Sequence, residues 1–348
     1  MRNDTRLKFN AYMTQLATLN NVADVTKKFT VEPSVQQTLE DKMQESSAFL
    51  GMINVMGVQE LKGEKLGLGI NSTIAGTTDT TLGDREPVDP TSLVGMSYVC
   101  EQTNFDTALR YAKIDAWAKF PDFQTRIRDA IIKAQALDRI MIGFNGTSRA
   151  ATSNRVANPL LQDVNKGWIQ HVREDAPQQI MSEGVPASGK IYIYKPVSAD
   201  DTKAGDYTNL DALVFSLVNE YLPPHYQDDT ELVVILGREL LNDKYFPMIS
   251  DYAEVPTEKQ ALDVITSAKQ LGGLRVVRVP FFPSKSLMIT RLDNLSLYYQ
   301  EGARRRAVID NAKRDRVENF ESSNDAYVVE DYDGIAIAEN IEFTYRPA

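Results

Sequence analysis

PDFQTRIRDAIIKAQALDRIM, residues 121–141, is the stretch that decides the fold of this chain. Pro121 suits the first position of a helix, and Asp122 lies in the first turn, where the helix dipole favours a carboxylate. Gly143 and Gly146 end the pattern. About 22 residues at about 1.5 Å each give a helix of roughly 33 Å, which is long enough to be the spine of a domain.

One face of this predicted helix is apolar, because apolar residues recur along it at spacings of three and four. We expect this face to pack on the rest of the domain. The residues on it are Phe123, Ile127, Ala130, Ile131, Ala134, Leu137 and Met141. The residues that lie mostly away from it are Arg126, Arg128, Asp129, Lys133, Asp138 and Arg139.

A run rich in glycine, threonine and serine, Gly63 to Gly83, precedes the helix. Residues 53–74 predict strand and turn, residues 75–92 hold little to bury, and residues 96–114 predict a long strand. We interpret them as an antiparallel hairpin that crosses solvent and has a flexible tip. Such a hairpin is marginal alone, so we expect a neighbouring chain to stabilise it. The residues predicted on one face of its long strand are Tyr98, Cys100 and Gln102.

The N-terminal segment, residues 1–28, predicts an exposed amphipathic helix with Leu7, Tyr12, Leu16 and Leu19 as its apolar positions. Pro33 interrupts this helix, and a second helix is expected from Val35 to about Leu50.

Charge is unevenly distributed along the chain. Residues 1–28 carry five Arg and Lys residues against two Asp residues, a net charge of +3 in a chain whose total is −10. The remainder therefore carries −13. A basic arm on an acidic body can meet nucleic acid or an acidic protein, or it can be a solvated helix face. An acidic body argues against sequence-specific wrapping of DNA.

The part after the long helix predicts an α+β arrangement. Residues 210–222 and 238–249 predict helices, residues 231–237 a buried strand, and residues 272–300 two or three further strands. A basic segment, 302–316, is followed by an acidic one, 318–333, and a last strand, 334–345.

The residues of most catalytic and metal sites are scarce, since the chain has one cysteine and two histidines. It has no nucleophile elbow, phosphate loop or dinucleotide motif. We therefore predict no catalytic residue, no metal site and no cofactor. Cys100 has no partner for an internal disulfide, and no apolar run is long enough for a signal peptide or a membrane span. These features are typical of a protein made in a reducing cytoplasm.

Three consecutive arginines, Arg304, Arg305 and Arg306, form the main candidate contact site. They could bind phosphate. We favour instead a contact with carboxylates of a neighbouring subunit, because the chain offers its own acidic segment with Glu318 and Glu321.

Ten segments, in order over nearly the whole chain, resemble the major capsid proteins of peduoviruses, the phage P2 family. They include KKFTVEPSVQQTL (27–39), GEKLGLG (63–69), DFQTRIRDAIIKAQALDRIMIGFNG (122–146), LVVILGRELLNDKYFP (232–247), LDNLSLYYQEGARRR (292–306) and DRVENFESSNDAYVVEDYDG (315–334). Residues 182–206 carry the least resemblance.

The resemblance implies an α+β fold of the Hong Kong 97 (HK97-like) capsid type. Residues 1–51 would form an N-terminal arm, and residues 52–110 an extended loop hairpin with the start of the peripheral domain. Residues 111–164 would hold the peripheral domain with its spine helix, and residues 165–290 the axial domain. Residues 291–348 would return as strands to the peripheral domain.

The resemblance also implies the function and partners of a head shell. Copies would assemble through pentamers and hexamers, guided by an internal scaffolding protein and a protease. A portal protein would occupy one vertex, and DNA would lie non-specifically against the inner face, with no membrane partner. The protease would trim the arm near Phe29 and Thr30. Assembly would take place in the bacterial host cytoplasm, and the product would be the virion.

Two other functions remain open from the residues. One is an encapsulin-like nanocompartment, which uses the same fold to enclose cargo enzymes. The other is a soluble enzyme whose acid/base pair of carboxylates the sequence does not reveal.

Overall fold

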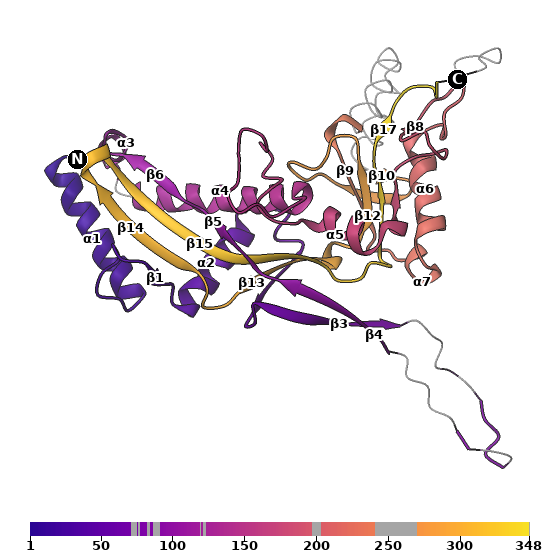
Figure 1. The fold of residues 1–348 in the computed structure, drawn as a ribbon, viewed down its shortest axis with the longest axis horizontal. Helices are drawn as coiled ribbons and strands as arrows, with labels where there is room; N and C mark the ends of the chain where they lie inside the picture. The colour runs from indigo at the N-terminus through magenta and orange to yellow at the C-terminus, as the bar shows by residue number, and fades with distance from the viewer. Residues whose placement is uncertain are drawn as a thin grey trace, which may run out of the picture.

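A computed structural model describes the chain except for residues 71–74, 76, 82–83, 86–90, 119, 121–122, 197–202, 241–269 and 348. Two sheets organise the described residues, with helices between and beside them (Figure 1). Residues 241–249 of the helix expected over 238–249 and part of the predicted hairpin tip lie outside the described residues.

The larger sheet has seven strands, which come from residues 29–110 and 295–329. Its long central strand, β15 (Arg316–Val329), pairs antiparallel with four of the others. The other strands are β1 (Phe29–Thr30), β2 (Asn54–Val58), β5 (Glu101–Asn104), β6 (Thr107–Arg110), β13 (Leu295–Gln300) and β14 (Arg305–Asn311).

The smaller sheet has six strands in the order β10-β11-β9-β12-β16-β7. Their bounds are β7 (Ile180–Met181), β9 (Val233–Leu236), β10 (Gln270–Leu271), β11 (Leu274–Val277), β12 (Leu287–Thr290) and β16 (Ile335–Ala338). Helices α6 (Leu210–Tyr221) and α7 (Pro224–Gln227) lie beside this sheet, and β8 (Ile191–Tyr192) pairs with β17 (Ile341–Glu342). The predicted helix over 210–222, the buried strand over 231–237 and the strands within 272–300 are confirmed.

The expected domain division at residue 291 does not follow the sheets. Strands β13 to β15 belong to the larger sheet, but β16 lies between β12 and β7 in the smaller one. Residues 291–348 are therefore divided between the two sheets, and the domain bounds stay a prediction.

The hairpin is confirmed as a pair of antiparallel strands, β3 (Lys62–Ile70) and β4 (Thr91–Val99). It projects away from both sheets (Figure 1). Tyr98 and Cys100 share a face as predicted, where they pack with Tyr298. Beyond Cys100 the prediction of one long strand to residue 114 is wrong, because the chain changes partner. It pairs with β15 as β5 and β6 and then forms helix α3 (Tyr111–Trp117), which leaves Gln102 exposed.

The spine helix is present as α4 (Phe123–Asn145), but its buried face is not the predicted one. Ala130 and Ala134 are exposed, whereas a neighbouring set of side chains is buried: Ile132, Gln135, Ala136, Arg139 and Ile140. The apolar pattern failed because this face also buries two polar side chains, Gln135 and Arg139, which hydrogen-bond to carboxylates from other elements.

Three further helices complete the described structure: α1 (Asn3–Leu19), α2 (Pro33–Glu45) and α5 (Trp168–Asp175). The two predicted N-terminal helices are thus confirmed. Pro33 begins the second helix, as suits its fixed φ. Leu16 of α1 is buried, but Leu7 and Leu19 face solvent with exposed fractions of 70% and 55%.

The main apolar core lies where α4 and α5 meet both sheets. Trp168 of α5 is fully buried, and its ring packs edge-on against Phe144 and Tyr327. The indole N–H donates to the carbonyl oxygen of Ser296 at 2.9 Å. Gly143 lets this ring approach α4, because a Cβ there would lie 2.2 Å from the Trp168 ring. Gly143 therefore serves packing and does not end the helix.

We predict that Gly143→Ala destabilises the fold, although alanine is the better helix former by about 1 kcal/mol. Forcing the Trp168 ring aside should lower the free energy of unfolding by about 1–3 kcal/mol. Gly51→Ala is the matched control, because a Cβ there meets only atoms at 3.6 Å or more. Denaturant unfolding of the unassembled chain measures the free energy of unfolding of both variants. Equal values for Gly143→Ala and Gly51→Ala would contradict the packing role of Gly143.

Candidate functional site

A group of seven buried polar side chains joins α2, α4 and the larger sheet, and we call it the charge cluster. Each member is more than nine-tenths buried. The members are Glu40 of α2, Gln135 and Arg139 of α4, Arg304 just before β14, and Glu321, Ser323 and Asp325 of β15.

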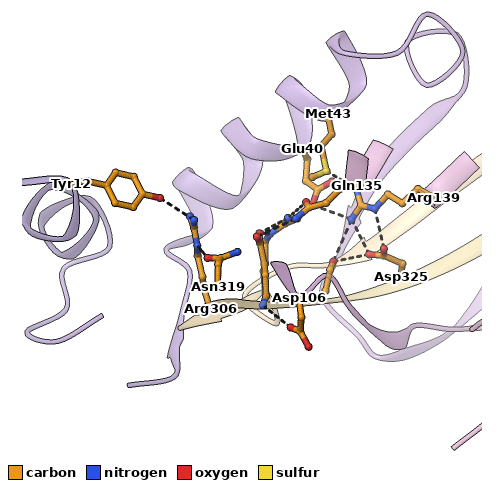
Figure 2. A network of polar contacts seen from close by, with 12 residues as sticks. Tyr12, Glu40, Met43, Asp106, Gln135, Arg139, Arg306, Asn319 and Asp325 are labelled. Atoms are coloured by element: carbon orange, nitrogen blue, oxygen red, sulfur yellow. Dashed lines mark hydrogen bonds and ion pairs between the residues drawn. The ribbon is translucent and has the colours of Figure 1, made fainter. Parts of the chain in front are cut away.

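Arg139 lies between two carboxylates, as Figure 2 shows. Its Nε and Nη2 donate to Asp325 at 3.0 Å each, in a bidentate pair. On the other side, Nη1 donates to Glu40 Oε2 and Nη2 to Glu40 Oε1. Ser323 accepts from Nη2 at 3.3 Å and donates its own hydroxyl to Asp325 at 2.6 Å. This arginine therefore connects helix α2 to strand β15.

Arg304 completes the cluster from the other end. Its Nε donates to Glu321 Oε1 at 2.8 Å and its Nη1 to Glu40 Oε1 at 2.6 Å. Its Nη2 donates to Gln135 Oε1 at 2.7 Å, and Gln135 Nε2 donates to Glu321 at 3.1 Å. Glu40 is thus shared by both arginines.

The surroundings of the cluster shift the pKa values of Glu321, Arg139 and Arg304 in the direction that favours their charged forms. Burial alone would raise the pKa of Glu321, but the charges of Arg304 and Arg306, with hydrogen bonds from Arg304 and Gln135, lower it to about 2. Burial works to lower the pKa of both buried guanidiniums, and the surrounding carboxylates outweigh it and raise the pKa of each. Glu321, Arg139 and Arg304 are therefore charged at neutral pH.

The expected intersubunit role of Arg304 and Glu321 is corrected by this geometry. Both side chains are buried within the subunit and pair with each other at 2.6 Å. Of the remaining candidates, Glu318 pairs with Arg316 of the same strand. Arg306 is half-buried and donates to Asn319 at 2.7 Å and to the Tyr12 hydroxyl at 3.0 Å. Arg305 is exposed and has no ion pair among the described residues, so it alone remains a free candidate.

The chain around the predicted cleavage junction is also paired and partly buried within the subunit. Phe29 and Thr30 form β1 and pair with Arg306 and Arg305 of β14. Phe29 is buried in an apolar group with Leu16, Val31, Tyr111 and Val308. The predicted junction therefore lies within a paired strand. A protease that cut here would first need β1 to separate from β14.

The arm helix α1 docks on α3 and β14 through a few polar contacts around an apolar face. Asp310 of β14 accepts from the Arg6 guanidinium and from the Tyr111 hydroxyl. The backbone N–H of Arg2 donates to Asp115 at 2.9 Å, and Lys8 donates to the carbonyl oxygen of Ala118. These contacts lie at the surface, in contrast to the buried pairs that hold α2.

The described residues offer little for chemistry. Burial, with the charges of Asp325 and Glu101, raises the pKa of the Cys100 thiol to about 12, so this thiol is unreactive. No group of three or more potential metal ligands occurs among the described residues. None of the described helices is long and apolar enough to span a membrane.

We predict that Arg304→Met lowers the free energy of unfolding by about 3–5 kcal/mol, because it leaves buried carboxylates without their partner. The neighbouring Arg305→Met is the matched control, since an exposed side chain should matter by less than about 0.5 kcal/mol. Chemical unfolding of the unassembled chains gives both values. Similar losses in the two variants would refute the assignment.

The lowered pKa of Glu321 also predicts that the free energy of unfolding depends on pH. Its pKa falls from the ordinary 4.5 to about 2, so its ionised form stabilises the fold above about pH 4.5 and this contribution is lost as the pH falls toward 2. The loss should be smaller in Glu321→Gln by an amount on the order of 3 kcal/mol. Glu45→Gln, at an exposed position, should follow the wild type. The measurement is the free energy of unfolding of wild type, Glu321→Gln and Glu45→Gln between pH 5 and 2. The same pH dependence in all three chains would contradict the lowered pKa of Glu321.

Comparison with known proteins gives one consistent family. The family described as "Phage major capsid protein, P2 family" matches residues 8–341. The chain is 50% identical over 345 residues to the protein named "Capsid proteins" of Escherichia phage P2, covering 98% of this chain and 96% of that protein. It is 38% identical to the major capsid protein of Serratia phage KSP20, covering 99% and 98% of the two chains.

A solved structure shows the same fold. A chain in the satellite phage P4 procapsid, determined with the size determination (Sid) protein, is 48% identical with a TM-score of 0.80, and 99% of each chain is covered. This match confirms the expected α+β capsid fold. With sequence and structure in agreement over almost its full length, the chain belongs to the P2 family of phage major capsid proteins, which form the shell of the virion.

Proposed function

We propose that copies of this chain close the head shell through five- and six-membered rings, guided by an internal scaffolding protein that contacts the N-terminal arm. The projecting β3–β4 hairpin is the observation that carries the ring proposal (Figure 1). A two-stranded ribbon is marginal alone in water, so it needs a neighbouring chain. Heterologous contacts of this kind generate rings when the rotation closes.

The exposed face of α1 supports a scaffold contact. Leu7 and Leu19 face solvent, while Phe9 and Leu16 pack on the body. The arm therefore docks on its own subunit and still presents apolar and basic side chains to a partner. After assembly, a protease would separate the arm at Phe29–Thr30, once β1 has opened.

Three further parts of the proposal rest on charge and on the family. The acidic body would leave packaged DNA weakly held against the inner face. A portal protein would occupy one vertex, and assembly would take place in the cytoplasm of the bacterial host. Membership in a phage capsid family favours this function over a cargo-enclosing nanocompartment, and a structural role over an enzyme.

Deletion of residues 1–28 tests the role of the arm. We expect the truncated chain, co-expressed with its scaffolding protein, to give no closed shells in electron microscopy, whereas the full chain does. Because the deletion also uncovers apolar residues under α1, a double variant at the exposed positions, Leu7→Ser with Leu19→Ser, provides the sharper test. It leaves the docked face intact and should reduce shell yield several-fold.

The matched control for this pair is Gln15→Ser, an exposed polar position of the same helix. It should assemble normally. Normal shells from both the deletion and the double variant would disprove the arm's role. Mass spectrometry of mature particles tests the cleavage, since an intact Met1 in every copy would exclude it.

A further inference from the structure

The loop between α4 and α5, residues 147–164, is a structured projection that we call the α4–α5 loop. It extends from α4 on the side opposite the hairpin (Figure 1). Asn154 Oδ1 accepts from the N–H groups of Val156 and Ala157 at 3.0 and 3.2 Å, and Asp163 Oδ2 accepts from the N–H of Asn154 at 2.7 Å. These bonds hold Val156 in solvent with an exposed fraction of 93%, and Leu160 is also exposed.

A cavity of about 260 Å³ lies at the base of this loop, between it, β5 and α4. Two buried polar atoms in its wall have no hydrogen-bond partner among the described residues: Asp163 Oδ1 and Thr103 Oγ1. Their residues have exposed fractions of only 7% and 5%. Leaving such atoms unsatisfied is costly, so the cavity calls for a group that donates hydrogen bonds.

The charges around the cavity favour a cationic donor. Asp138 and Asp163 both line it. Burial raises the pKa of Asp138 more than the charge of Arg155 lowers it. Arg149 also lines the cavity, but it donates to the carbonyl oxygens of Val164 and Gln102 at 2.8 and 2.6 Å and lies 3.6 Å from Glu101.

With Arg149 engaged in this way, Arg155 is the other arginine that lines the cavity beside Asp138 and Asp163, and its side chain is exposed. The cavity therefore has two carboxyl groups and one arginine that is not already engaged with other groups. It also lacks a donor for Asp163 Oδ1 among the described residues, and a cationic side chain would supply both a donor and a positive charge.

We propose that the α4–α5 loop cavity receives a lysine or arginine side chain from a second copy of the chain, with Val156 and Leu160 packing against the same neighbour. This inference rests on the proposed ring assembly and adds a contact to it. A free cation would satisfy Asp163 but would leave Val156 held in water. A neighbouring copy accounts for both, and the chain has exposed cations such as Arg305 that lack a carboxylate partner among the described residues.

Two variants test the proposal. Asp163→Asn keeps an acceptor for the backbone N–H of Asn154 but removes the negative charge. Val156→Ser removes an apolar side chain that is 93% exposed in the subunit and so should affect only the contact with the neighbour. For both variants, the free energy of unfolding of the unassembled chain should be higher than that of wild type or lower by no more than about 0.5 kcal/mol. In co-expression with the scaffolding protein, both should reduce shell yield at least tenfold. Asp129→Asn, at an exposed position of α4, should change neither property.

The outcomes separate cleanly. Normal shells from both variants would overturn the proposal. A stabilisation of unassembled wild type by MgCl₂, absent in Asp163→Asn, would overturn it in favour of a metal ion. Shells from wild type and from Asp129→Asn, with loss confined to the two variants, would support it. Failure of wild type to form shells would instead refute the proposed function itself.

Discussion

The structure depends on the burial of two guanidiniums among three carboxylates. Moving such groups out of water costs several kcal/mol per ion, and the cost is offset only when nearly every donor and acceptor is paired. Here Arg139 and Arg304 share Glu40 between them, and Asp325 and Glu321 receive bidentate or paired donors. Because the members come from α2, α4 and β15, the arm, the spine helix and the C-terminal strands are held in one arrangement. Loss of one arginine leaves carboxylates of α2 and β15 buried without their partner.

This cluster divides the arm into two parts of different strength. Helix α2 enters the cluster through Glu40, whereas α1 is held by an apolar face and by surface contacts such as Arg6 with Asp310. Surface ion pairs contribute typically less than about 1 kcal/mol each. The strand between the two helices, β1, has only two residues. A cut near residue 29 would therefore release the weakly held part and leave the strongly held part in place, which supports the proposed junction.

Local pattern was enough to predict the elements whose residues interact with their sequence neighbours. The hairpin, the spine helix, α6 and the buried strand β9 follow from alternation, helical spacing and turn residues. The buried face of α4 did not, because Arg139 becomes a core residue only through Glu40 and Asp325, which lie 99 and 186 positions away. One signal was available. Polar residues at every second position of β15, from Asn319 to Asp325, all face α4 and α1, and such a polar stripe on a central strand indicates buried partners. Gly143 was misinterpreted for the same reason, since Trp168 is remote in sequence.

The distribution of stability suits a subunit that fits more than one kind of ring, as proposed above. The body is fixed by buried pairs and by the aromatic core around Trp168, so it would enter each ring with one shape. The hairpin and α1 are joined to that body by few buried contacts and can adjust without disturbing it. A hairpin that is marginal alone would be stabilised by contact with a neighbour, so its folding and that contact would be coupled. In the proposed rings each added subunit would then stabilise the hairpin beside it, and closure of the shell would be cooperative.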